Sequence, residues 1–460
     1  MLFSKLLILL WAVNFAPPLL AQLLEGKWSR PVDGDRLFLD GRPLFGSHKT
    51  VRGVLAGVAS GTITGALLGF PFWIGITAGI LSMSGDLFSS FLKRRLSFLS
   101  GDVVPGLDQV PEGILPFLVI GPYFSLSVGY VLLFGAVFGV GAYYGSIFLN
   151  RVLLGRPFDS YPRQVRAATR MRELISCKIT AAPFHYILNF EDAFYYHFLM
   201  KTAFKVLRIY EQGKANALLI EKREIDFHLR DLPTAFDGYR ILLLTDLHLD
   251  GLEGLVDKTI EIVRETSADA CILGGDYRME TYGPFAEALF QLNRLLPEIK
   301  APDGIFAVLG NHDCVEMMDA VQGVSFLVND SRCIERNGDR IWLVGADDCH
   351  YYKAHNLQHA FDGVPQGAFS IFISHSNEIY REARVYGPKL FLCGHTHAGQ
   401  IKIPPFGPVF THSKAPRHMC EGRWEFEKMA GYTSGGVGVS GVPVRFNSKG
   451  EITVITLKSA

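Results

Sequence analysis

The stretch that decides the fold is YRILLLTDLHLD, residues 239–250, in which a run of Leu and Ile ends in Asp246 and His248. A short apolar run bounded by polar residues is typical of a buried strand. Side chains two residues apart on an extended segment point to the same side, so this strand offers a carboxylate and an imidazole to one metal ion.

Two further apolar runs end in polar clusters in the same way. ACILGGDYRME leads to Asp276, and the two glycines before it allow a sharp turn that lets the carboxylate bridge two ions. GIFAVLGNHD ends with Asn311, His312 and Asp313. These three supply a neutral amide ligand, a histidine suited to general acid catalysis and a carboxylate to orient that histidine.

The last two clusters are rich in histidine. FSIFISHS contains His375, and KLFLCGHTHAGQ contains His395 and His397 before a glycine turn. A single histidine after a strand is more often a hydrogen-bonded structural residue, so each cluster is weak evidence alone. Five clusters in this order are much stronger evidence.

Together the motifs D-x-H, G-D, G-N-H-D, S-H and G-H-x-H resemble the calcineurin-like metallophosphoesterase family. The resemblance implies an α/β four-layer sandwich, with two mixed sheets flanked by helices and the metals at the strand ends. In this family the metals activate a water that attacks phosphorus. Mixed oxygen and nitrogen ligands fit Mn, Fe or Zn.

The resemblance also implies a role for each residue. His312, held by Asp313, would be the general acid, and Asp276 would bridge the two metals. The first metal would be held by Asp246, His248, Asp276 and His397, and the second by Asp276, Asn311, His375 and His395.

The N-terminal third has the pattern of membrane helices. Charged residues are absent from Gly53 to Gly85 and from Gly113 to Asn150, runs of 33 and 38 residues. At about 20 residues per crossing, each run predicts a helical hairpin. Residues 6–24 are also apolar, as either a cleaved signal peptide or a retained helix, and the further spans favour retention. We therefore expect about five transmembrane helices.

The loops beside these helices mix acidic and basic residues, a combination that suits a Mg²⁺-bound polyphosphate. The segments DGRPLFGSHKTVRG, GDLFSSFLKRR and PGLDQ resemble the CDP-archaeol synthase family. That family implies a five-helix enzyme that uses Mg²⁺ and CTP to convert a lipid phosphate into a CDP-lipid. Its substrate-binding residues here would be Lys49, Asp86, Lys93, Arg94 and Asp108.

One position departs from that family. Where the family repeats an Asp three residues after the one at Asp108, this chain has Pro111, followed by Glu112. The N-terminal domain is therefore either a working cytidylyltransferase or a degenerate copy kept as an anchor or as a platform that presents lipid.

Loop charges and cysteines bear on localisation. The basic loops 27–52, 93–95 and 151–172 fall on one side of five spans, which predicts a multi-pass protein of the cytoplasmic membrane with its phosphoesterase domain in the cytoplasm.

Seven cysteines without a C-x-x-C pair predict neither a disulfide framework nor a zinc finger, and favour a reducing compartment. With 45 basic and 45 acidic residues, the net charge gives no indication of a nucleic-acid partner.

These patterns divide the chain into a CDP-archaeol synthase-like transmembrane domain (1–155), an amphipathic, interfacial linker (156–216) and a metallophosphoesterase domain (217–460). A glycine-rich stretch near Arg445 predicts either part of a phosphate pocket or a hairpin turn.

We expect a membrane-bound hydrolase of a phosphate ester or pyrophosphate bond in a lipid or nucleotide-lipid, with CTP as a partner of the N-terminal domain. The alternative is a degenerate membrane anchor joined to a hydrolase of soluble nucleotides or phosphodiesters. A non-catalytic scaffold is disfavoured because every metal-ligand position is filled.

Overall fold

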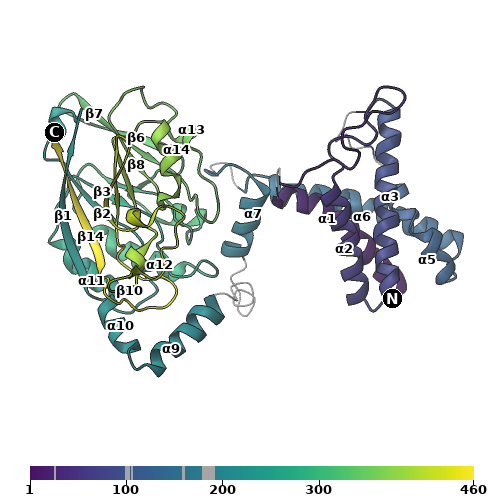
Figure 1. Ribbon diagram of the computed structural model, residues 1–460, viewed down its shortest axis with the longest axis horizontal. Coiled ribbons are helices and arrows are strands. Elements are labelled where there is room, and N and C mark those ends of the chain that lie inside the picture. The colour runs from purple at the N-terminus through teal and green to yellow at the C-terminus, as the bar shows by residue number, and fades with distance from the viewer. Residues whose placement is uncertain (25–26, 99–103, 105–106, 158–160, 179–191) are drawn as a thin grey trace. The chain divides into compact units, whose positions relative to one another are not determined.

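The chain forms two compact units in this computed structural model (Figure 1), which describes residues 1–24, 27–98, 104, 107–157, 161–178 and 192–460. The first unit comprises Met1–Pro157 and Val165–Arg170, and the second comprises Phe158–Gln164 and Met171–Ala460.

The first unit is helical. Its helices are α1 (Leu2–Leu24), α2 (Val51–Leu67), α3 (Phe72–Arg95), α4 (Gln109–Ile114), α5 (Phe117–Tyr123) and α6 (Val128–Leu154). Leu6, Leu9 and Leu10 of α1 are fully buried in one core with side chains from α3, α5 and α6. Helix α1 is thus an integral part of this core.

Within the described residues, three helices are long and apolar enough to cross a membrane, namely α1, α3 and α6, while α2 is shorter at 17 residues. The second charge-free run was expected to form two spans, but it holds one long helix, α6, after the short helices α4 and α5. Pro116 separates α4 from α5, and proline lacks the N–H that a continuous helix needs. The predicted helical class is confirmed, and the lengths of its helices differ from the expectation.

The glycines spaced four residues apart in α2 line its packing face. Gly57, Gly61 and Gly65 are all buried, and a Cβ added to Gly61 would lie 2.7 Å from the carbonyl oxygen of Gly75 in α3. Small residues allow two helix backbones to approach this closely.

Short helices lead into the second unit. They are α7 (Ala167–Glu173), the π-helical turns η1 (Leu174–Lys178) and η2 (Asp192–Met200), α9 (Lys201–Val206) and α10 (Tyr210–Ala217). Of the predicted amphipathic linker 156–216, residues 158–160 and 179–191 lie outside the described residues.

The second unit contains two six-stranded sheets, both of them mixed. The first has the order β1 (Ile220–Leu229), β14 (Gly450–Ser459), β2 (Arg240–Leu244), β3 (Ala270–Leu273), β4 (Ile305–Ala307), β5 (Val324–Phe326). The second has the order β12 (Gly422–Phe426), β13 (Met429–Thr433), β9 (Leu390–Cys393), β8 (Ser370–Ile373), β7 (Asp339–Gly345), β6 (Asp330–Arg336).

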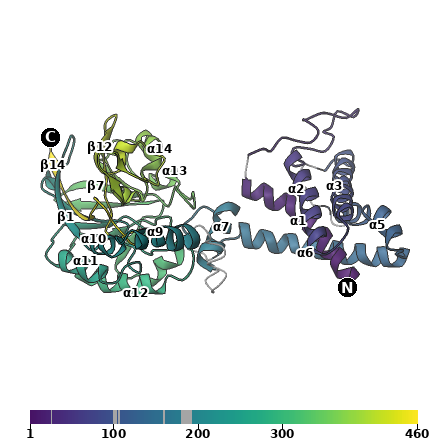
Figure 2. The same cartoon turned by 60° about the horizontal axis from the view of Figure 1, so that its bottom comes forward.

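A large apolar core lies between the sheets, with Ile241 and Ile272 from the first and Ile371 and Leu390 from the second. On the outer face of the second sheet, α13 (Leu357–Ala360) and α14 (Tyr380–Val385) pack in another apolar cluster. Helices α11 (Leu255–Arg264) and α12 (Ala286–Leu295) lie on the other side of the sandwich (Figure 2). This four-layer arrangement confirms the predicted fold.

The direction of the strands brings the polar clusters to the same edge of each sheet. Strands β2, β3 and β4 run parallel in the first sheet, and β8 and β9 run parallel in the second. The carboxyl ends of parallel strands meet at one edge of a sheet, where ligand sites of α/β proteins form. All five motifs directly follow these strands.

Candidate metal centre

Asp276, which follows β3, is the meeting point of three histidines. Its Oδ2 atom lies 3.2 Å from His375 Nε2, 3.7 Å from His248 Nε2 and 3.7 Å from His312 Nε2. All four side chains are buried or nearly so. A carboxylate shared by imidazoles from different strands has the position expected of the bridging ligand.

A second group forms around Asp246, which follows β2. His397 Nε2 lies 3.4 Å from Asp246 Oδ1 and 3.2 Å from His248 Nε2. These three residues can hold one metal ion, and Asp276, His375 and His395 form a separate group that can hold another. The two groups correspond to the two predicted ligand sets.

Asn311 completes the predicted set. It follows β4 beside His312, whose backbone N–H donates to Asp276 Oδ1 over 3.0 Å. The Oδ1 atom of Asn311 is buried and accepts no hydrogen bond from the described residues, which fits a metal ligand better than a structural amide. The structure therefore brings all seven predicted ligands and His312 into one region.

Hydrogen bonds fix the orientation of the imidazoles. Nδ1 of His375 faces the carbonyl of Gly274 at 2.8 Å, and Nε2 of His395 faces the carbonyl of His412 at 3.0 Å. A carbonyl only accepts, so these ring nitrogens carry the protons, and in the neutral rings the other nitrogens carry lone pairs. Those lone pairs belong to His375 Nε2 and His395 Nδ1, which are 3.2 Å apart and need a proton or cation between them.

The backbone around the site is strained. Five of the seven predicted ligands have φ between 40° and 72°, a left-handed conformation that residues with a side chain rarely adopt. These five are Asp246, His248, Asp276, His395 and His397. Such conformations cluster at functional sites, where the surrounding structure enforces them.

Electrostatics couple the central carboxylate and histidine. Burial alone would raise the pKa of Asp276, but His375 and His312 hold it well below its ordinary value. Burial alone would lower the pKa of His375, but Asp276 raises it to about 10. For His312, burial dominates and lowers the pKa to about 3. In the metal-free protein His375 is therefore protonated and His312 neutral.

The structure corrects the expected role of Asp313. Its carboxylate accepts backbone N–H groups of Gly310, Asp276 and Tyr277 over 2.7–2.8 Å. The Nδ1 atom of His312 makes no hydrogen bond within the described residues, so Asp313 does not orient that ring. Because the chain turns tightly after β3 and β4, the carboxylate is occupied by main-chain donors and fixes the backbone of Asp276.

Arg278 was not found from the sequence, yet it organises the same loop. Its fully buried guanidinium donates to the carbonyls of His312, Gly283 and Thr281, and it reaches that of Ser176 at 3.4 Å. All these partners are main-chain oxygens, so no partner side chain in the sequence marks this role.

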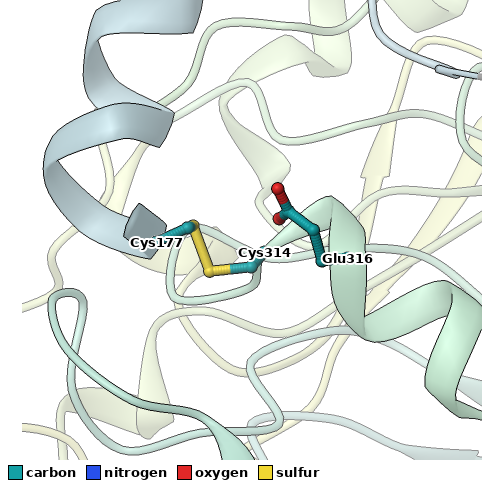
Figure 3. Close-up of side chains that lie close together, drawn as sticks. All are labelled: Cys177, Cys314 and Glu316. Atoms are coloured by element: carbon teal, nitrogen blue, oxygen red, sulfur yellow. A yellow bond between two sulfur atoms is a disulfide. The ribbon is translucent and has the colours of Figure 1, made fainter. Parts of the chain in front are cut away.

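A disulfide joins the same elements. Cys177 in η1 is bonded to Cys314, the residue after Asp313 (Figure 3). The cysteines were expected to form no disulfide framework, and one disulfide is nevertheless present, between residues 137 positions apart in sequence. Glu316 lies close by, but cysteines joined in a disulfide have no thiolate to offer a metal.

Arg445 is a structural residue. Its guanidinium donates to the carbonyls of His397, Gly435, Gly436, Gly438 and Lys449. The stretch forms no hairpin, because β13 before it and β14 after it belong to different sheets. The guanidinium is fully buried among main-chain oxygens, where it holds this connection between the sheets.

A second cluster missed from the sequence lies beside His395. The ring of His350 lies 4.4 Å from that of His395, and its Nδ1 lies 2.9 Å from Glu378. His350 follows β7 in the segment DDCHYY, which contains none of the five motifs.

In the helical unit, the five predicted substrate-binding residues line one cavity of about 430 Å³. Lys49 pairs with Asp86 at 2.6 Å and Lys93 with Asp108 at 2.6 Å. Glu112 also lines the cavity and accepts a hydrogen bond from Asn14 over 2.7 Å. A carboxylate is thus present despite the proline at position 111.

Comparisons with known proteins agree with this division. Residues 239–399 match the family model of calcineurin-like phosphoesterases, and residues 1–138 match that of CDP-archaeol synthase. The uncharacterized metallophosphoesterase YkuE of Bacillus subtilis (strain 168) is 29% identical over 254 residues, which are 52% of this chain and 86% of the relative. A transmembrane protein with metallophosphoesterase domain of Danio rerio is 27% identical over 277 residues, 55% of this chain and 61% of the relative. The CDP-archaeol synthase of Pyrobaculum aerophilum is 41% identical over 111 residues, 23% of this chain and 68% of the relative.

The chain is thus a membrane protein and an enzyme of the metallophosphoesterase class, whose members use a dinuclear metal centre. More particularly, its N-terminal part belongs to the CDP-archaeol synthase family and its C-terminal part is a calcineurin-like phosphoesterase domain.

Metal uptake is expected to release a proton. In the metal-free state Asp276 raises the pKa of His375 to about 10, and a metal must displace the proton held there. Below that pKa, the apparent affinity for Mn²⁺ or Zn²⁺ should rise by up to about tenfold per pH unit. Titration calorimetry in buffers of different ionisation enthalpy measures the release. Affinity that does not change with pH, or release that persists in His375→Gln, would contradict this assignment.

Proposed function

We propose that the C-terminal domain uses two divalent metal ions to hydrolyse a phosphate ester or pyrophosphate bond of a lipid or nucleotide-lipid. The observation that carries the proposal is the convergence of acceptor atoms from five separate strand ends, among them the lone pairs of His375 and His395 at 3.2 Å. When bound, such ions activate water and neutralise phosphate charge.

The chain's own residues have distinct parts in this proposal. Asp246, His248, Asp276 and His397 hold one ion, and Asp276, Asn311, His375 and His395 hold the other. His312 protonates the leaving oxygen or stabilises the charge that develops on it. Its neutral state suits the second task, in which a ring N–H donates a hydrogen bond to the developing oxyanion, whereas the first requires the ring to take up a proton before it gives one. Its Nδ1 atom has no partner in the described structure. Asp313 has an indirect role, because it accepts a hydrogen bond from the backbone N–H of Asp276 and so holds that residue in position.

The roles of His312 and His248 can be separated. Replacement of His312 by Gln should lower kcat by about 10²–10⁴-fold, the usual contribution of a general acid, while two metals stay bound. Replacement of His248 by Gln should lower metal content as well as turnover. Both are measured by elemental analysis and by hydrolysis of bis(p-nitrophenyl) phosphate. Loss of metal from the His312 variant would show that His312 is a ligand and not the acid.

A lipid-borne substrate is supported by the fusion to a membrane domain. A CDP-lipid contains a pyrophosphate bond of the kind that this chemistry cleaves, so the two halves of the chain would act on related lipids. The competing proposal, that the hydrolase acts on soluble nucleotides or phosphodiesters, predicts equal turnover with and without a lipid on the same phosphate.

A second activity, CTP-dependent formation of a CDP-lipid, is favoured by the cavity of the helical unit. It gathers Lys49, Asp86, Lys93, Arg94 and Asp108 around a space of about 430 Å³. Carboxylates there would hold Mg²⁺, and the basic side chains would neutralise the phosphates of CTP. Glu112 supplies an acidic group close to the position where the family has its second Asp.

Synthesis is best tested in the His312→Gln background, because the hydrolase would otherwise consume the product. Purified protein with Mg²⁺, CTP and phosphatidate should then form CDP-lipid and pyrophosphate. Asp86→Asn should reduce the rate by at least about tenfold, in line with loss of a group that orients a metal. Absence of CDP-lipid in the background protein would leave the N-terminal domain as an anchor.

We further propose that the phosphoesterase domain faces the cytoplasm, because the basic loops all fall on one side of the spans. The Cys177–Cys314 disulfide favours the opposite orientation, because disulfides are more usual in an oxidising compartment. Cys333 is the one exposed cysteine of the seven and is free. A membrane-impermeant maleimide should label it in inverted vesicles and not in right-side-out vesicles, with Cys333→Ser as the blank. The reverse pattern would place the domain outside.

A further inference from the structure

The phosphoesterase unit exposes apolar side chains on a hairpin that begins directly after the candidate metal ligands. Strands β10 (Lys402–Ile403) and β11 (Gly407–Pro408) form this hairpin, starting five residues after His397. Phe406 at its tip is 83% exposed and Ile403 is 52% exposed. Surface side chains of this size gathered on one segment mark an interaction site.

The hairpin is tightly coupled to the metal centre. A Cβ added to Gly399 would lie 2.1 Å from Pro408, so the two segments are in close contact. Beyond β11, Phe410 packs near His412, whose carbonyl faces His395 Nε2 at 3.0 Å. Whatever binds the hairpin is therefore held close to the metal ligands.

A second exposed apolar segment is packed against the base of the hairpin. Phe204 of α9 stacks on Phe446 with ring centroids 5.6 Å apart, and both belong to an apolar cluster that includes Ile401. Elements α9 and β10 lie at the same end of this unit (Figure 1). Val206 and Leu207, at the end of α9, are 75% and 65% exposed.

The charges around these segments are mostly positive. Residues 401–421 contain Lys402, Lys414, Arg417 and Glu421, of which Lys402 is paired with Glu421, and residues 198–211 contain three basic residues and Glu211. Lys414 and Arg417 are exposed. Apolar side chains flanked by basic ones are the pattern of a surface that enters the interface of an anionic lipid layer.

We propose that the hairpin 401–410, together with the exposed face of α9, docks onto the lipid bilayer and presents phosphate groups of its lipids to the metal centre. The proposal deepens the proposed hydrolase function and rests on it for the identity of the substrate, but the docking itself is independent of catalysis. The occupant is a lipid surface because the chain is a membrane protein and the rim of the surface is cationic.

Docking is tested on the full chain in nanodiscs that contain anionic lipid. Phe406→Cys in a Cys333→Ser background is labelled with an environment-sensitive fluorophore, and Val385→Cys is the matched control. Val385 is 76% exposed on α14 of the same unit. Doxyl lipids should quench the label at position 406 at least twofold more than the label at 385. Equal quenching at the two positions overturns the proposal, as does shielding of position 406 by a second copy in nanodiscs that hold two chains.

A catalytic measurement separates this proposal from the proposed function. Phe406→Asp should lower the ratio of CDP-diacylglycerol turnover to bis(p-nitrophenyl) phosphate turnover by about tenfold, and Val385→Asp should leave that ratio unchanged. An unchanged ratio in Phe406→Asp overturns the presentation of lipid phosphates. If position 406 is quenched by lipid but no lipid phosphate is hydrolysed, docking stands and the lipid substrate fails.

Discussion

The C-terminal site depends on one constraint: it buries more hydrogen-bond acceptors than donors in one pocket. Main-chain carbonyls occupy the outer nitrogens of His375 and His395 and that of His248, so their inner nitrogens cannot donate while the rings are neutral. These nitrogens face one another and the carboxylates of Asp246 and Asp276. Without a cation this pocket must take up protons. Asp276 accordingly raises the pKa of His375 to about 10, so that His375 holds a proton at neutral pH.

Such a pocket would open unless the surrounding chain held it closed. Asp313 binds three main-chain N–H groups, and Arg278 and Arg445 bind main-chain carbonyls on either side of the site. The Cys177–Cys314 disulfide fixes the residue after Asp313. These contacts offset the strain of the left-handed residues, which costs about 1–3 kcal/mol each. The supporting residues are therefore as much a part of the site as the ligands.

The sequence was sufficient to predict which candidate ligands come together, but it did not reveal the residues that hold their backbone in place. Asp246 and His375 could be found because each follows an apolar strand in a recognisable motif, and strand direction alone brings such ends together. Arg278 binds main-chain carbonyls, which every residue has, so its partners cannot be identified from a sequence motif. The Cys177 pairing requires knowing which distant segments meet in the fold. The role of Asp313 was misassigned because its neighbour in sequence, His312, is not its partner in space.

In the helical unit, the helical class and the residues that line the cavity followed from the sequence, whereas the lengths of the helices did not. Pro116 interrupts an apolar run that hydropathy alone treats as continuous, whereas charged residues among apolar helices stand out in any reading of composition.

The two candidate sites differ in how their charges are balanced, and this difference bears on what each one binds. In the helical unit, Lys49 and Lys93 are already paired with Asp86 and Asp108, so the cavity is stable without a resident cation. A Mg²⁺–nucleotide that brings both charges can exchange with these pairs and leave again. In the phosphoesterase domain, no lysine or arginine is paired with Asp246 or Asp276 in the described structure, so the balancing charge must come from protons or from metal ions that stay. This difference supports the proposals made above, a nucleotide site in the helical unit and a metal site in the phosphoesterase domain.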